Sequence, residues 1–174
     1  MSLQRISLRD FVIVRQLELD VANGFSVLSG ETGAGKSILI DALQLVLGAR
    51  ADAGVVREGA ARTEISAGFA AGSAVNHWLQ DNGFDQSDEL LLRRSVDAQG
   101  KSRAWINGSA ATAAQLRDIG DQLVDIHGQH AWQSLTKPSA VRGLLDAYAG
   151  VDSRSLQQAW DEWRTAQHTL SNAR

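Results

Sequence analysis

Apolar residues recur with two different periods along the first fifty positions of the chain. In residues 16–21, QLELDV, leucine and valine alternate with polar residues, which is typical of a half-buried strand. Residues 3–8, LQRISL, predict a partner strand, and residues 25–28, after an Asn-Gly turn, predict a fully buried strand. Across residues 36–50 the apolar positions recur at helical spacing, and Gly48 predicts the end of that helix.

The same two periods alternate through the rest of the chain. Residues 49–62 are rich in Ala, Gly and Arg and predict a loop. Strands are predicted at 63–70, 89–97 and 101–108, and helices at 73–83, 112–126 and 137–150. Thr112 stands three residues before Gln115, which predicts a capping box at the start of one helix. Strands mixed with helices indicate the α/β class.

The last twenty residues have a different character. Leu156, Trp160, Trp163, Gln167 and Leu170 step by four and three positions, as in a heptad seam. The seam covers barely two heptads. It predicts either an amphipathic helix on the domain's own core or the root of a coiled coil. In both cases the two tryptophans need a partner surface.

Composition narrows the class of protein. A chain of 174 residues with 44% apolar residues has enough length for one folded domain and an appendage. The net charge of −3 gives no global attraction to nucleic acid, although 14 arginines against 3 lysines leave room for a local phosphate-binding patch. The chain has no cysteine, so disulfides and thiolate metal sites are excluded. No apolar run is long enough for a membrane span, and a cytoplasmic location is expected.

One segment carries a specific chemical signal, a match to the phosphate-binding pattern G-x-x-x-x-G-K-[ST]. The matching residues are Gly30, Glu31, Thr32, Gly33, Ala34, Gly35, Lys36 and Ser37. Fewer than about one chain in a hundred of this length would match by chance. The glycines let backbone N–H groups converge on phosphate oxygens, and the helix that follows presents its positive end to the same anion. Lys36 would reach the β- and γ-phosphates, and the Ser37 hydroxyl would bind Mg²⁺.

Hydrolysis needs more than this loop, because an acidic residue at the end of an apolar strand normally helps to hold Mg²⁺. Only two apolar residues precede Asp125, and Asp146 falls within a predicted helix. The sequence therefore contains no convincing strand of this kind. A self-contained P-loop kinase or other small NTPase that uses Asp125 remains an alternative, as does an interaction module with a vestigial loop.

Several stretches in order resemble the amino-terminal head segment of the SMC-like ABC ATPases. The similarity covers about residues 3–150 and continues into the heptad seam. It is carried by LRDFVIVRQLELDVANGFSVLSGETGAGKSILIDALQLVLGAR, RADAGVVREGA, RRSVDAQGKSRAWING, LVDIHGQH and LLDAYAG. In that family the head is split, and a long antiparallel coiled coil separates its two parts. The resemblance implies that residues 1–150 form the amino-terminal half of an ABC/SMC-type head with a mixed β-sheet and flanking helices. Residues 151–174 would begin the coiled-coil arm.

The resemblance also implies roles for residues outside the P-loop. Gln129 in HGQH matches the Q-loop glutamine, which would contact Mg²⁺ and sense the γ-phosphate; the alternative is an ordinary loop glutamine. Arg57 in VVREG matches an arginine that reaches nucleotide across a head dimer, or it is a solvated loop residue. His127 and His130 flank Gln129, but two histidines without a third ligand make a thin zinc site.

A basic hairpin is the remaining candidate surface. Arg93, Arg94, Lys101 and Arg103 fall on the two predicted strands of residues 89–108. They could contact DNA phosphates, or they could be charges that keep an exposed sheet edge from pairing.

The function implied by the resemblance is ATP binding, with Mg²⁺, by part of an ATPase for double-strand-break repair and recombination. Hydrolysis would require the carboxy-terminal half of the same head and a second head that joins by ATP-dependent dimerisation. DNA would be the partner of the full-length protein, which would act in the cytoplasm at the nucleoid.

Overall fold

Six strands form one antiparallel sheet in this computed structural model, which describes residues 2–29, 35–124, 126, 138–149 and 154–172. The strands are β1 (Leu3–Phe11), β2 (Val14–Asp20), β3 (Arg62–Ala70), β4 (Glu89–Asp97), β5 (Ser102–Ile106) and β6 (Ser109–Ala111). Their order across the sheet is β2-β1-β3-β4-β5-β6, and each neighbouring pair runs antiparallel. β2 and β6 are therefore the edges of the described sheet.

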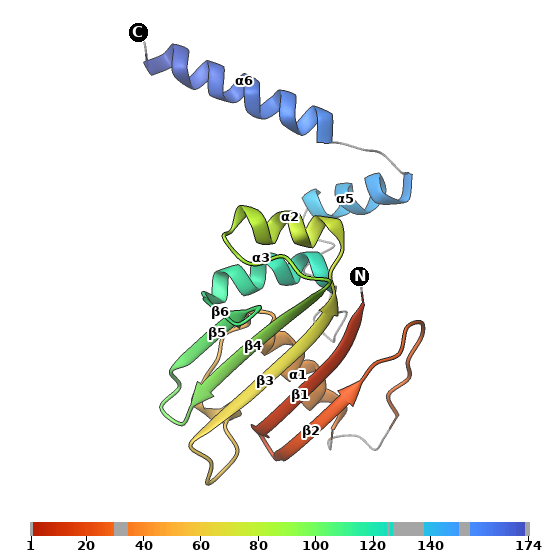
Figure 1. Ribbon diagram of the computed structural model, residues 1–174, viewed down its shortest axis with the longest axis vertical. Helices are drawn as coiled ribbons and strands as arrows, with labels where there is room; N and C mark the ends of the chain where they lie inside the picture. The colour runs from red at the N-terminus through yellow and green to blue at the C-terminus, as the bar shows by residue number, and fades with distance from the viewer. Residues whose placement is uncertain (1, 30–34, 125, 127–137, 150–153, 173–174) are drawn as a thin grey trace. The chain divides into compact units, whose positions relative to one another are not determined.

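The helices are α1 (Lys36–Val46), α2 (Ser73–Asp81), α3 (Ala113–Leu123), α5 (Pro138–Ala149) and α6 (Arg154–Asn172), with a short 3-10 turn η1 (Ala53–Val55). The chain divides into two compact units, residues 1–125 and 126–174. α1 lies behind the sheet in Figure 1 and contacts β1, β3 and β4, whereas α2 and α3 contact each other. No helix in the described part of the chain is long and apolar enough to cross a membrane.

The core lies between one face of the sheet and the helices α1, α2 and α3. Strand residues that alternate along the chain point to this face, because successive side chains of a strand project to opposite sides. The largest of them that are fully buried are Leu8, Phe11, Ile65, Phe69, Leu90, Leu92 and Ile106. From the helix, Ile38, Ala42, Leu45 and Val46 meet them at the helical spacing that the sequence predicts. This packing fixes α1, and so the start of the helix, against the sheet.

Local signals in the sequence explain how two of these helices begin and end. Thr112 Oγ1 accepts from the Gln115 N–H at 3.1 Å, and Gln115 Oε1 accepts from the Thr112 N–H at 2.9 Å. The predicted capping box is thus confirmed at the start of α3. Gly48, with φ +94°, follows the end of α1 as predicted.

The strand expected at residues 25–28 is wrong for the described structure. These residues form no strand, and the Phe25 side chain is 95% exposed, with Val27 and Leu28 also exposed. An apolar run is buried only where strands or helices cover both of its faces. No described strand pairs with residues 25–28, so their side chains remain in solvent.

The second unit contains α5 and α6. α6 is helical through the predicted heptad seam, and Leu156, Trp160, Trp163 and Leu170 are all exposed along it. The rings of Trp160 and Trp163 lie 4.9 Å apart between centroids. An apolar stripe of this kind on a surface helix marks a contact surface rather than a solvated face.

Candidate nucleotide-binding site

The described part of the P-loop is the start of α1. Gly35 is the residue before the helix, Lys36 and Ser37 form its first turn, and the other five residues of the motif, 30–34, lie outside the described residues. The first turn of α1 has no acidic residue, and Gly35 has no side chain with which to cap it. The first backbone N–H groups of a helix have no acceptor within the helix, so this end is suited to an anion.

Gly35 is not crowded by the described residues. A Cβ built on Gly35 would meet no atom of the described residues within 4 Å. Ser37 is exposed and Lys36 is half-buried, so the hydroxyl and ammonium that the motif requires both stand at this end of the helix. These groups fit a magnesium-bound phosphate, for which hydroxyl oxygen and a lysine are the ordinary protein partners.

The other end of α1 is held tightly. A Cβ on Gly48 would lie 2.6 Å from the Ala113 carbonyl oxygen and 2.7 Å from the Arg117 backbone nitrogen. The Arg117 side chain donates from Nη2 to the Gly48 carbonyl oxygen at 3.0 Å. The helix that follows the P-loop is therefore anchored against α3 at its carboxyl end.

Arg57 has an acidic partner, and its side chain is 34% exposed. Its Nε donates to Asp10 Oδ1 at 2.7 Å, and its backbone N–H donates to the Asp10 carbonyl oxygen at 2.9 Å. Asp10 and Val12 both have positive φ, +50° and +51°, which for a β-branched valine is a strained conformation. Val12 N–H donates to the Val55 carbonyl oxygen at 2.9 Å, so the strained β1–β2 turn holds the segment that carries Arg57.

Arg57 and Asp10 open onto a hollow of about 310 Å³. Its lining comes from β1, β3 and the loop that joins Arg57 to β3: Arg9, Asp10, Arg57, Gly59, Ala60, Ala61, Arg62 and Glu64. Arg62 pairs with Glu64 at 3.2 Å. The carboxylates partly neutralise the arginines that border this hollow.

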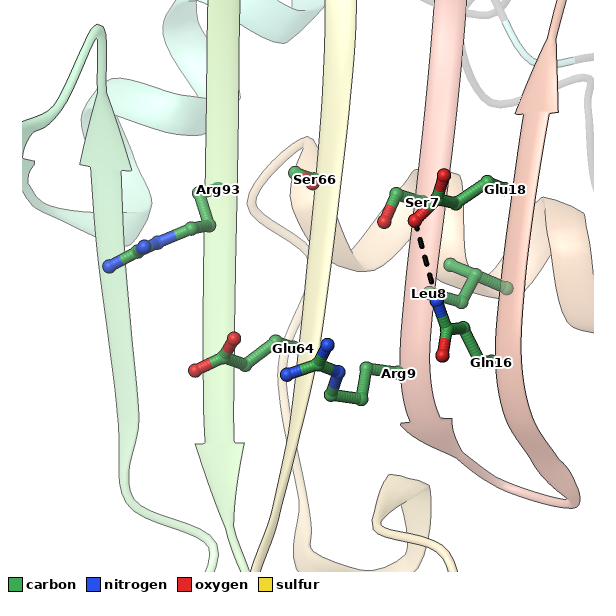
Figure 2. Close-up of a pocket in the computed structure, with 8 residues that line it drawn as sticks. All are labelled: Ser7, Leu8, Arg9, Gln16, Glu18, Glu64, Ser66 and Arg93. Atoms are coloured by element: carbon green, nitrogen blue, oxygen red, sulfur yellow. Dashed lines mark hydrogen bonds between the residues drawn. The ribbon is translucent and has the colours of Figure 1, made fainter.

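The outer face of the sheet, opposite α1, carries mixed charges. A hollow of about 160 Å³ lies on this face, and Figure 2 shows the residues that line it, which come from β1, β2, β3 and β4. Its lining combines two arginines, Arg9 and Arg93, with two glutamates, Glu18 and Glu64, and with the polar residues Ser7, Gln16 and Ser66 beside Leu8. Acidic and basic groups are present in equal number there, so the hollow offers no excess of positive charge to a phosphate backbone.

The structure differs in two respects from the prediction for the basic hairpin. Arg94 is 3% exposed and points to the core, whereas Arg93 lies on the outer face, 4.1 Å above the Trp105 ring. β4 has a neighbour on both sides at Arg93 and Arg94, so these two residues do not lie on a sheet edge. β6 pairs only with Ala104–Ile106 of β5, so edge protection stays a prediction for Lys101 and Arg103. Of the four basic residues, Arg93, Lys101 and Arg103 remain on the surface.

The sequence contained a signal for the position of Arg94. Leu90, Leu92, Arg94 and Val96 alternate along β4, and all four are buried. The period of two places them on one face.

The remaining candidates lie outside the described residues or have other roles. Gln129, His127, His130 and Asp125 are not among the described residues. Asp146 lies inside α5, as predicted, and not at the end of a strand. Asp97 ends β4, but its Oδ1 accepts from the Gln99 and Lys101 N–H groups of the turn. In the described part of the chain, no three His, Cys, Asp or Glu residues gather as a metal site.

Comparison with known families fits this geometry. The family model described as an AAA domain matches residues 5–129, which include the P-loop and most of the described sheet. The chain belongs to the AAA domain family. Within that family it resembles RecN, as three curated relatives named DNA repair protein RecN indicate. The identity is 42% to the Vibrio cholerae protein over 99% of this chain, 45% to that of Xylella fastidiosa strain 9a5c over 93%, and 40% to that of Bacillus subtilis over 92%.

This AAA domain chain spans about a third of the length of those relatives, since the matches cover 32%, 30% and 28% of them. Solved structures confirm the expected SMC-type fold. The Smc head domain with a coiled coil and joint from Pyrococcus yayanosii has a TM-score of 0.66 at 23% identity, covering 98% of this chain and 37% of that one. An SMC ATPase whose ATP-driven dimerisation and DNA-stimulated activation have been described has a TM-score of 0.60 at 24% identity, covering 83% and 97%.

Proposed function

We propose that this chain is the ATP-binding amino-terminal part of a RecN-like ATPase that acts in DNA double-strand-break repair and recombination. The observation that carries the proposal is the P-loop motif of residues 30–37 at the start of α1, where Gly35 supplies no side-chain cap. Residues 30–37 would surround the phosphates, with Lys36 at the β- and γ-phosphates. Ser37 and Gln129 would hold Mg²⁺, which supplies charge neutralisation when it is bound.

Arg57 would add a positive charge to this nucleotide site. Its guanidinium is paired with Asp10 in the described structure, so it is held in a defined place before any nucleotide arrives. An arginine near a γ-phosphate offsets the charge that develops as the phosphoryl group leaves. We place it near the nucleotide in a pair of engaged heads.

The exposed residues 25–28 support the division of the head into two parts. In a P-loop protein the strand before the loop normally lies inside a sheet, with neighbours on both sides. Here its apolar side chains are exposed and no described strand pairs with it. We propose that the carboxy-terminal part of a longer protein supplies the neighbouring strands and the acidic Mg²⁺ ligand, with residues 1–150 as the half-head. Residues 151–174 would start the coiled coil between the two parts.

The remaining elements of the proposal concern partners and place. A second head would join through ATP, DNA would bind to the full-length protein, and the protein would work in the cytoplasm at the nucleoid. The alternative of a self-contained P-loop kinase finds no support in the described residues, which hold neither a strand beside residues 25–28 nor an acidic metal cluster.

Complementation tests this proposal. ATP turnover is measured for the chain alone, and then after mixing with the carboxy-terminal part of the Vibrio cholerae relative, which is 42% identical to this chain over the shared segment. We expect negligible turnover alone and a clear gain on mixing, abolished by Lys36→Ala. Robust turnover by the chain alone would favour the kinase alternative, and no gain with any RecN partner would count against the split head.

A further inference from the structure

Arg94 is a buried charge without an acidic partner among the described residues. It is 3% exposed, and Thr63 is the other polar side chain buried in the described core. No ion pair joins Arg94 to a described carboxylate. Burying a guanidinium costs several kcal/mol unless other groups satisfy it. The hydrogen-bond acceptors around Arg94 therefore indicate which elements the buried guanidinium joins.

Those groups belong to the carboxyl end of α1 and to the neighbouring strand. Arg94 Nη1 donates to the Leu45 carbonyl oxygen at 3.1 Å, and its Nε donates to Ser102 Oγ on β5 at 2.7 Å. The carbonyl end of a helix carries partial negative charge, so it is a favourable place for a cation. One side chain thus joins β4, β5 and the last turn of α1.

A second cation also contacts this end of the helix. Arg117, on α3, donates to the Gly48 carbonyl oxygen, two residues beyond the end of α1. Burial, and to a lesser degree the charge of Arg117, lowers the pKa of Arg94. The environment thus disfavours the charged form of Arg94 relative to water. Arg117 already donates to a carbonyl oxygen at this end of the helix, so capping alone does not require a second arginine.

The helix connects this contact to the P-loop. α1 has 11 residues and is about 16 Å long, since each residue adds about 1.5 Å. Lys36 and Ser37 occupy its other end, so a shift of the carboxyl end along the axis also moves them. The hairpin of β4 and β5 is tied to that end through Arg94, while the adjacent Arg93 stacks on Trp105 at the outer surface.

We propose that Arg94 is a positioning residue that fixes the P-loop helix to the β4–β5 hairpin and thereby sets the phosphate-binding groups in place. The expected effect on nucleotide binding rests on the proposed nucleotide site. The mechanical link itself concerns residues of this chain alone. It can therefore be tested with and without nucleotide.

The test compares Arg94→Met, which keeps the aliphatic stem, with Thr63→Val as a matched control. Thr63 is fully buried and its hydroxyl donates to the Arg9 carbonyl oxygen of β1 at 2.8 Å, not to a group of α1. Amide hydrogen exchange of residues 39–46 is measured without nucleotide, and Mg-ATP affinity is measured by calorimetry. Arg94→Met should speed exchange in α1 and weaken Mg-ATP binding, each about tenfold. Thr63→Val should change both by less than about threefold at equal folded fraction. Arg94→Lys should recover part of the loss.

Equal effects of Arg94→Met and Thr63→Val on α1 exchange would overturn the inference. If Arg94→Met does not fold, Ser102→Ala removes only the acceptor of Nε and decides the question. It should speed α1 exchange by about threefold, and no change would overturn the inference. If the wild-type chain does not bind Mg-ATP, the proposed function fails, whereas the exchange measurement without nucleotide still decides the role of Arg94.

Discussion

Gly48→Ala probes the anchoring of the P-loop helix most sharply. The residue follows α1 with φ +94°, and a Cβ there would lie 2.6 Å from the Ala113 carbonyl oxygen and 2.7 Å from the Arg117 nitrogen. A left-handed conformation costs a residue with a Cβ about 1–2 kcal/mol. Both contacts are with backbone, so α1 and α3 must move apart, which adds about 1–3 kcal/mol. The total is a large share of the roughly 5–15 kcal/mol that holds a domain together.

The control is Gly83→Ala, at the equivalent place after α2. Gly83 has φ +75°, and a Cβ there would meet no described atom within 4 Å. Gly83→Ala has the same left-handed conformational cost and the same change in unfolded-chain entropy as Gly48→Ala, but its Cβ meets no backbone atom of the described residues. The free energy of unfolding of each variant is measured by urea titration followed by circular dichroism. Gly48→Ala should be less stable than Gly83→Ala by about 1–3 kcal/mol. A difference below about 0.5 kcal/mol would show that the end of α1 does not lie against α3 as described.

Three further predictions follow from individual contacts. In a double-mutant cycle of unfolding free energies, Asp10→Asn and Arg57→Met should couple by about 1 kcal/mol, and the coupling should fall with added salt; additivity would refute the pairing. Thr112→Ala should lower stability by about 1 kcal/mol in the same titration, because α3 loses its cap, and an unchanged midpoint would contradict that. Replacing both Trp160 and Trp163 by alanine should reduce self-association in sedimentation; a wild-type chain that is monomeric at high concentration would contradict the exposed apolar seam.

Short-range patterns predicted most of the described elements. The alternation in residues 16–21 and 63–70 and the Thr112–Gln115 box each depend on neighbours within a few positions, so the sequence alone specified them. The strand expected at 25–28 failed because its burial depends on neighbours that the described residues do not supply.

Long-range contacts at the candidate site could not be predicted in the same way. The Asp10–Arg57 pair joins positions 47 apart, and Arg94 meets Leu45 across 49 positions. Local periodicity gives no information about such partners. The P-loop motif was visible because its chemistry is local, whereas the side chains that hold its helix come from β4 and α3.

Calorimetric titration of Mg-ATP into the chain and into Lys36→Ala tests the central claim most directly. Urea titration of both proteins provides the stability control, because Lys36 lies at the start of α1 outside the buried core. We expect one nucleotide to bind each wild-type chain. Lys36→Ala should bind none, with an unchanged unfolding midpoint. Equal binding by the two proteins, or no binding by either, would contradict a phosphate site at the start of α1.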